Sequence, residues 1–249
     1  MPVEASQLSA SWQNFGPTLE AHDIRAELKD GGEFSVKRVT LALDVWQSLL
    51  HMRWQFRDLT FWQLRFRTNT PITSGGGNDS LEASHISDLF LRQFDHFDLR
   101  DSEVSFLTPS GQRAELAIPQ LTWLNDPRRH RAEGLVSLSS LTGQHGVMQV
   151  RMDLRDDEGL LSNGRVWLQA DDIDLKPWLG KWMQDNIALE TAQFSLEGWM
   201  TIDKGDVTGG DVWLKQGGAS WLGEKETHTL SVDNLTAHIT RENPGWQFS

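Results

Sequence analysis

Apolar and polar residues alternate along most of the second half of the chain. From 148 to 154 every second residue is Met, Val or Leu, and the rhythm returns at 165–170 after an acidic, glycine-containing turn at 156–159. Strict alternation is typical of a strand with one buried face. Similar segments at 19–28, 34–45, 54–66, 97–107, 114–123, 194–202, 212–214 and 230–239 raise the expected total to roughly 14 strands. The sequence therefore predicts a mainly β fold.

One apolar face of this predicted sheet is too large for the rest of the chain to cover. About 14 strands set side by side at about 4.8 Å would span about 65 Å, and open sheets of that width usually curl. We therefore expect a long, curled, open antiparallel sheet whose apolar side forms a hydrophobic groove, which is a binding surface. The candidate lining residues are Met148, Val150, Met152, Leu154, Val166, Leu168, Phe194, Leu196, Met200, Ile202, Val212 and Leu214. Each of them can equally belong to an ordinary packed core.

Two segments depart from the alternation and predict one medium and one short helix. Between 80 and 97 the apolar residues recur every three or four positions, which is helical spacing. The short helix is expected at 174–183, with Asp174 as its N-cap and Pro177 in its first turn.

A Gly/Ser-rich stretch at 73–80 predicts a linker between two regions. Residues 1–72 are expected to be an N-terminal β segment of the groove. Residues 81–249 are expected to be a helix followed by repeated β-hairpins that continue it. Because 246–249 resembles the opening of a strand, we expect a piece of a longer protein, truncated at 249.

Composition narrows the class of partner. The chain has 23 Lys and Arg against 35 Asp and Glu, a net charge of −12, which disfavours nucleic acid. The absence of Cys excludes disulfides, thiolate catalysis and Cys-ligated zinc. No apolar run of about 18 residues is present, so no membrane-spanning helix is expected. The 12 Trp residues are expected to pack in largely apolar surroundings.

A search for catalytic and cofactor motifs finds none of the common ones. The chain has no nucleophile elbow, phosphate-binding loop, dinucleotide fingerprint or HExxH motif. Asp95–Asp98 with His85 could hold a metal, but His85 and His96 are spaced for different sides of a helix. The acidic run 171–174 fits a solvated strand end, and 128–131 fits an exposed turn. We therefore expect no catalytic residue, no metal and no cofactor.

Arginine and aromatic residues are interleaved between His51 and Arg67. The simplest interpretation is a pair of amphipathic strands with Arg on the solvated face. Trp and Arg are also typical of a lipid headgroup interface. Stacking of single-stranded nucleic acid is a third interpretation, which the net negative charge disfavours.

Three segments carry a resemblance to a known family. Pro2–Leu8, Gly16–Ile24 and the helix-then-strand segment Ile86–Phe106 are similar to the N-terminal region of AsmA-like proteins. This resemblance implies a non-enzymatic, bridge-like lipid transfer segment in the bacterial periplasm. Its β-groove would conduct phospholipid acyl chains from inner to outer membrane and so support the outer-membrane permeability barrier. The full-length protein would be anchored in the inner membrane by a helix absent from this chain, and envelope protein partners are possible.

Two alternatives remain open on the residues alone. Trp-rich sheets often stack sugars, so a carbohydrate-binding β-protein is one. The other is a structural envelope scaffold whose apolar face contacts a protein partner.

Overall fold

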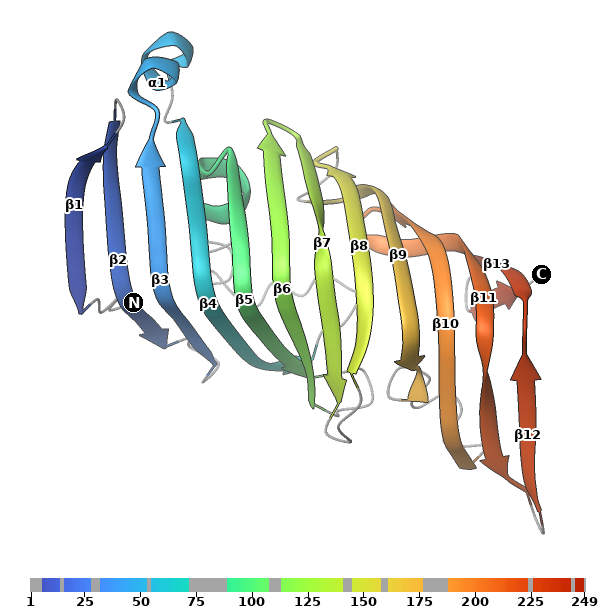
Figure 1. Cartoon of the computed structure of the whole chain (residues 1–249). Helices are drawn as coiled ribbons and strands as arrows, with labels where there is room; N and C mark the ends of the chain where they lie inside the picture. Colours follow the sequence, from blue (N-terminus) through green and yellow to red (C-terminus); the bar gives the residue numbers. More distant parts are fainter. Residues whose placement is uncertain are drawn as a thin grey trace.

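A computed structural model of the chain shows fourteen strands in one open, curled sheet (Figure 1). It describes residues 6–13, 16–27, 32–52, 55–71, 89–107, 113–140, 145–157, 161–176, 188–223, 226–242 and 245–248. The strands pair in sequence order from β1 to β11, followed by β13 and β14, while β12 also pairs with β11. The predicted fold class, a mainly β chain with a long, curled, open sheet, is confirmed.

Most strands run across the sheet, whereas β12 and β13 each pair with only one part of β11. The first seven are β1 (Gln7–Gln13), β2 (Gly16–Glu27), β3 (Glu33–Leu43), β4 (Phe56–Pro71), β5 (His96–Leu107), β6 (Arg113–Asp126) and β7 (Arg129–Ser140). The others are β8 (His145–Arg155), β9 (Asn163–Asp174), β10 (Ala188–Asp203), β11 (Asp206–Leu222), β12 (Thr227–Val232), β13 (Leu235–Glu242) and β14 (Gly245–Phe248).

The helical segments differ in part from the prediction. A short helix, α1 (Val45–His51), lies between β3 and β4, where none was expected. The medium helix predicted at 80–97 is described only from residue 89, as the π-helical turn η1 (Leu89–Gln93). Of the short helix at 174–183 only the start is described, and there Asp174 Oδ1 accepts a hydrogen bond from the backbone N–H of Lys176 at 2.9 Å. The linker at 73–80 lies outside the described residues, so the domain division stays a prediction.

One junction departs from the predicted antiparallel pattern. Strands β4 and β5 are parallel, with Phe61 and Leu99 as register partners. Parallel neighbours cannot be joined by a tight hairpin, because the chain must return along the strand length before the second one starts. The end of this crossover is η1, which lies behind β4 and β5 in Figure 1. In contrast, Lys204 and Gly205 join β10 to β11 directly, and their positive φ values of 54° and 82° fit a type I′ turn.

A single row of register partners crosses twelve strands and contains only apolar residues and glycine. From β1 to β13 this apolar row is Leu8, Ala21, Val39, Phe61, Leu99, Leu121, Gly134, Val150, Leu168, Gly198, Val212 and Ala237. At about 4.8 Å per strand it is about 50 Å long. Because side chains alternate between faces, the adjacent row points the other way. That polar row is His22, Arg38, Trp62, Arg100, Gln120, Leu135, Gln149, Gln169, Glu197, Trp213 and Thr236. We call the side of the apolar row the inner face and the other side the outer face.

An irregular band crosses β2, β4 and β5 near their middle and β9 near its C-terminal end. Four non-glycine residues in it have left-handed backbone, Asp23, Gln63, Asp101 and Asp172, with φ of 50°, 52°, 47° and 53°. Such a residue reverses the alternation, so Phe61 and Leu64 on β4 both reach the same buried cluster despite their odd spacing. Serine hydroxyls accept hydrogen bonds from amides in this band. Ser102 Oγ accepts from the N–H of Leu64 at 3.2 Å, and Ser195 Oγ accepts from that of Asp172 at 3.0 Å.

Candidate functional site

The structure places all twelve candidate groove residues on the inner face, on β8 to β11. The apolar row itself includes three of them, Val150, Leu168 and Val212, and period-two spacing and register place the others on the same side. Four of the twelve are buried, and they are Met148, Leu154, Phe194 and Leu196. The other eight are partly exposed. This surface is therefore neither fully sealed nor fully open, and its contact with a ligand stays a prediction.

Aromatic side chains of η1 and the residue that follows it cover the inner face over β4 to β6. The ring of Phe90 lies 5.0 Å from that of Phe61 and 5.1 Å from that of Phe97, measured between centroids. Phe94 packs edge-on against Phe56 at 6.0 Å. Phe97 also stacks on Trp123 at 5.7 Å. These contacts explain why the apolar row is buried where it crosses β4 and β5.

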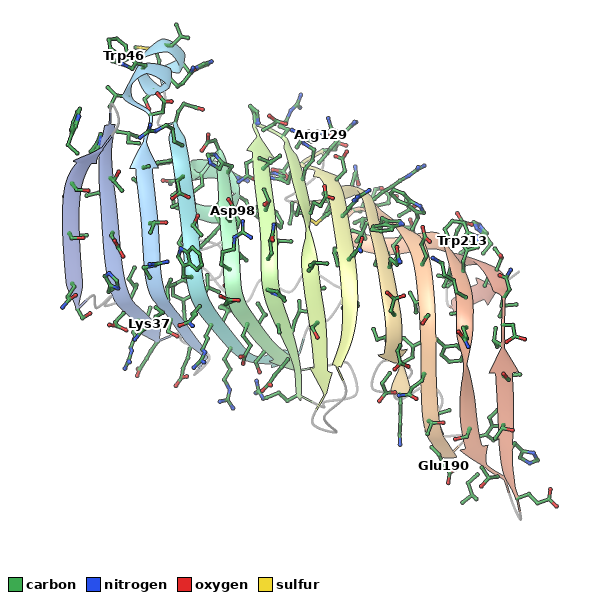
Figure 2. All side chains as sticks on the ribbon, in the orientation of Figure 1. Lys37, Trp46, Asp98, Arg129, Glu190 and Trp213 are labelled. Carbon is green, nitrogen blue, oxygen red and sulfur yellow. The ribbon has the colours of Figure 1, made fainter. Side chains whose placement is uncertain are left out.

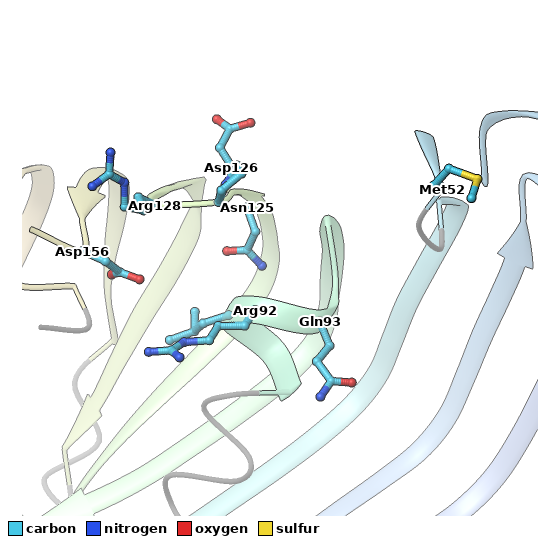
Figure 3. A pocket seen from close by; sticks show the side chains of 9 residues that line it. Met52, Arg92, Gln93, Asn125, Asp126, Arg128 and Asp156 are labelled. Atoms are coloured by element: carbon cyan, nitrogen blue, oxygen red, sulfur yellow. The ribbon is translucent and has the colours of Figure 1, made fainter. Parts of the chain in front are cut away.

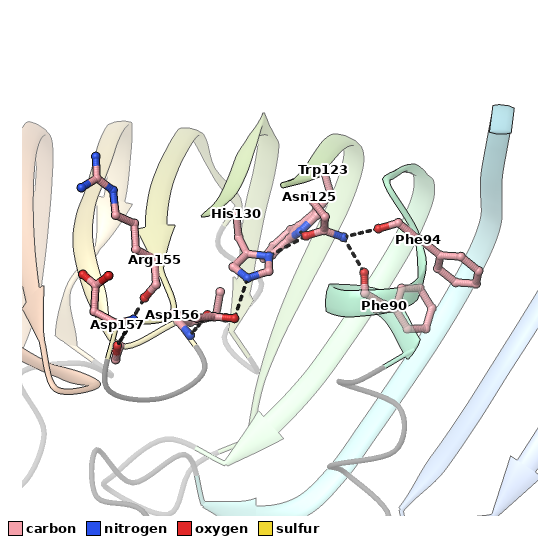
Figure 4. Close-up of polar contacts among 10 residues, drawn as sticks. Phe90, Phe94, Trp123, Asn125, His130, Arg155, Asp156 and Asp157 are labelled. Atoms are coloured by element: carbon pink, nitrogen blue, oxygen red, sulfur yellow. Dashed lines mark hydrogen bonds and ion pairs between the residues drawn. The ribbon is translucent and has the colours of Figure 1, made fainter. Parts of the chain in front are cut away.

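The side chain of Asn125 fastens this helical segment to the sheet (Figure 4). Its amide nitrogen donates to the carbonyl oxygens of Phe90 and Phe94 at 2.7 and 2.8 Å. Its oxygen accepts from Nε1 of Trp123 at 2.7 Å. Both contacts require the same orientation of the amide, so Oδ1 of Asn125 is the acceptor end.

His130 continues the same network in the buried interior, with a relative exposure of 1%. Its Nδ1 lies 2.6 Å from Oδ1 of Asn125, and its Nε2 lies 3.0 Å from Oδ2 of Asp156 (Figure 4). The other carboxylate oxygen of Asp156 accepts from the N–H of Leu161 at 2.7 Å. Both ring nitrogens therefore have an oxygen atom as their partner, which holds the imidazole from two sides. The network ties β6 and β7 to the loop after β8.

The prediction of an exposed turn at 128–131 is wrong for His130. The turn is Pro127–Arg128, and His130 already belongs to β7, opposite Asn125. Its even number matches the buried residues Ala132 and Val136, and that alternation is the signal that could have placed it on the inner face. Because the ring is buried and bonded on both sides, it supports the fold and cannot activate a nucleophile or water as it stands.

The acidic and histidine residues considered for a metal form an ion pair in the structure. Nδ1 of His96 lies 3.3 Å from Oδ2 of Asp95. The hydrogen bond that His96 donates to the carboxylate of Asp95 raises the pKa of His96 above its ordinary value. Burial raises the pKa of Asp95, but the hydrogen bond and charge of His96 outweigh it and hold that pKa below its ordinary value. His85 lies outside the described residues, and no group of three His, Asp or Glu within them is placed to hold a metal ion.

An open cavity of about 760 Å³ lies at the turn between β6 and β7, beside η1 and the end of α1 (Figure 3). Its lining includes Met52, Arg92 and Arg128. Two acidic residues also line it, but Asp126 pairs with Arg131 at 3.3 Å and Asp156 pairs with His130. This end of the sheet therefore combines a methionine side chain with two guanidinium groups.

Charged side chains along the outer face and the strand ends are visible in Figure 2. Arg129 donates two hydrogen bonds to the carboxylate of Asp153, from Nε at 2.8 Å and from Nη2 at 2.5 Å, and so lowers the pKa of Asp153. Glu197 lies 2.8 Å from Nζ of Lys215, and hydrogen bonds from Lys215 and Trp167 lower its pKa. These pairs hold charge in the solvated layer, away from the apolar row.

Several tryptophans lie on the outer face, which differs from the expected apolar surroundings. Trp167 and Trp199 are cross-strand partners with ring centroids 6.4 Å apart, and the guanidinium of Arg151 lies 5.2 Å above Trp167. Arg38 covers Trp62 in the same way at 4.6 Å. Cation–π contact and cross-strand packing, which sequence alternation does not encode, account for these positions.

Comparison with known proteins identifies the family. The model of the YhdP protein family matches residues 1–249, which is the whole chain. The chain belongs to the YhdP family. The intermembrane phospholipid transporter YhdP of Escherichia coli (strain K12) is 99% identical to it over 249 residues, 100% of the chain. The chain spans only 20% of the length of that YhdP transporter. No solved structure matches the chain. Within the described residues, no helix is long and apolar enough to cross a bilayer.

Proposed function

We propose that the chain is a non-enzymatic segment of a phospholipid conduit, in which acyl chains move along the inner face of the sheet. The observation that supports this most strongly is the apolar row, which is unbroken by a polar side chain over twelve strands. A compact core would need only a local apolar cluster, whereas a continuous stripe suits a long apolar ligand or a succession of them.

The near-identical E. coli relative supports the choice of ligand, since its name describes it as an intermembrane phospholipid transporter. By the same name we place the chain in the bacterial envelope, between two membranes. We further propose that the chain lies in the periplasm. The longer protein would be anchored in the inner membrane and would work with other envelope proteins.

The physical mechanism is a reduction of the cost of exposing hydrocarbon to water. Moving an acyl chain into water costs about 0.8 kcal/mol per CH₂ group. A continuous apolar surface lowers this cost along the path, while the charged headgroup stays hydrated at the open side. Gly134 and Gly198 contribute no side chain to the row, because a Cβ there would lie 2.3 Å from the carbonyl oxygen of Gln120 or 2.9 Å from that of Asp211. The surface itself gives no direction, so a net flux must be driven from elsewhere.

Native mass spectrometry after mild extraction tests this function. The wild-type chain should retain adducts with the masses of phospholipids. A chain purified under the same conditions without such adducts, and unable to take up added phospholipid, would contradict the proposal. Binding of envelope glycans in isothermal titration, with no lipid adduct, would favour the carbohydrate alternative.

A further inference from the structure

Helix α1 presents apolar side chains to solvent at one end of the sheet. It stands beyond the ends of β2, β3 and β4 (Figure 1), and none of its residues is buried. Trp46, Leu49 and Leu50 are 71%, 63% and 75% exposed, and Met52 at its C-terminal end is 90% exposed. The spacing 46, 49 and 50 places three of these side chains on one side of the helix. Such a cluster on a surface helix is usually a contact site.

Hydrogen bonds cap α1 and join it to Gln55, just before β4. Asp44 Oδ1 accepts from the N–H of Gln47 at 3.0 Å and caps the helix. The hydroxyl of Ser48 accepts from the N–H of Gln55 at 2.8 Å, and the N–H of Asp44 donates to the carbonyl of Gln55 at 2.8 Å. Val45 and Ser48 are therefore on the side that meets the protein, whereas Trp46, Leu49 and Leu50 are turned to solvent.

We propose that α1 inserts its apolar side into the interfacial layer of a phospholipid bilayer. The four exposed side chains offer on the order of a few hundred Å², whereas a stable protein interface buries about 800 Å² on each partner. A protruding wedge of this size suits a bilayer surface, where Trp and Leu enter the headgroup boundary without a complementary pocket.

The charge around the wedge fits anionic headgroups. Arg92 and Arg128 line the cavity that also contains Met52, as Figure 3 shows. The acidic groups of that cavity are engaged by Arg131 and His130. The exposed Arg128 can contact lipid phosphates when α1 is inserted.

This inference rests on the proposed function and names the place where lipid would pass from a bilayer onto the sheet. Helix α1 follows β3, the third strand from the end of the sheet at which the apolar row starts with Leu8, which is 75% exposed. The row crosses β3 at Val39, so about 20 Å of strand separates it from α1. A bilayer that holds α1 would therefore lie at the same end of the sheet as Leu8. Acyl chains would leave the bilayer there and pass onto the sheet.

A dye attached to α1 tests the insertion directly, because the chain contains no Cys. Leu50→Cys is labelled with an environment-sensitive NBD dye and mixed with vesicles of phosphatidylethanolamine containing phosphatidylglycerol. The control is Leu135→Cys, at an exposed leucine of the outer face. We expect a blue shift and a several-fold brighter signal at position 50 alone. No response at 50, or equal responses at both positions, would overturn the proposal. So would a response that follows protein concentration without vesicles, because the occupant would then be a second copy.

Vesicle flotation tests the same proposal with two matched double variants. Trp46→Ser combined with Leu50→Ser should weaken vesicle binding by about tenfold or more. Leu135→Ser combined with Leu222→Ser should leave it unchanged. Both double variants should fold normally, since all four side chains are exposed. The α1 variant should keep its co-purified phospholipid, which separates the two proposals. A wild-type chain that binds vesicles but carries no lipid adducts would count against the conduit. An α1 double variant that binds vesicles as well as the wild-type chain would count against insertion of α1.

Discussion

Val150 on β8 and Leu168 on β9 are direct register partners, and both side chains are partly exposed on the inner face. An aspartate at either position would place a carboxylate in the apolar row. If acyl chains cross this point, Val150→Asp and Leu168→Asp should each lose phospholipid adducts in native mass spectrometry. Because the sites are partly solvated, the new charge can stay hydrated, and the melting temperature should change only slightly.

The neighbouring residue supplies the control for that experiment. Gln149→Asp introduces the same charge one position away, on the outer face. It should keep the lipid adducts. Unfolding of both inner-face variants would mean that these residues form a sealed core, and retained adducts with normal folding would place them outside the lipid path.

Removal of the buried imidazole should be costly. His130→Ala leaves Asn125 and the Asp156 carboxylate without their partner, so the free energy of unfolding should fall by about 2–4 kcal/mol in chemical denaturation. The matched control is His238→Ala, which removes a 2.8 Å contact to Asp211 between two side chains that are more than half exposed. That change should cost less than about 0.5 kcal/mol. Equal losses for the two variants would mean that the network does not support the fold.

The pair of His96 and Asp95 should make stability depend on pH. The pKa of His96 lies above its ordinary 6.5, so its contribution is complete below about pH 6.5 and disappears as pH rises through the folded value. The pKa of Asp95 lies below its ordinary 3.8, so its contribution is present above about pH 4 and disappears as pH falls through the folded value. The stability lost in His96→Gln should therefore be greatest between about pH 4 and 6.5 and smaller at about pH 8. A loss that is constant across this range would refute the assignment.

Two glycines allow the cost of a strained backbone alone to be compared with the cost of strain plus a steric clash. Gly217 has a φ of 155°, and a Cβ there would lie 2.2 Å from the carbonyl oxygen of Gln193. Gly205 has a φ of 82°, with nothing within 4 Å of such a Cβ. In thermal denaturation Gly205→Ala should cost about 1 kcal/mol, from strain alone, and Gly217→Ala about 3 kcal/mol. A cost at Gly217 no larger than that at Gly205 would show that β10 and β11 can separate without penalty.

Period-two alternation is sufficient to predict most of the strands, although not β1 or β7, and the shared face of the twelve candidate residues, because it depends only on local backbone geometry. It could not predict Asp23, Gln63 or Asp101 as left-handed positions, since these residue types also occur in regular strands. The parallel pairing of β4 with β5 is a long-range choice with no local signal. The network of Asn125, His130 and Asp156 gives no sequence signal, because each residue lies near a turn, where polar side chains are usually solvated. For α1, seven residues were too few to establish a helical period.

The parallel junction also has a consequence for the order of folding. Contacts such as that between Leu64 and Ser102 join residues 38 positions apart, whereas the β6–β7 and β10–β11 hairpins close through two-residue turns. Loop closure over the longer distance costs more entropy. The hairpins of β1–β4 and those from β5 onward should therefore form first, and the pairing of β4 with β5 should form late. Leu99→Ala should then mainly accelerate unfolding, while Ala132→Gly on β7 should mainly slow refolding in stopped-flow measurements. The seam between β4 and β5 would accordingly be the place where partly folded chains expose unpaired strand edges, and where exchange of segments between molecules would begin.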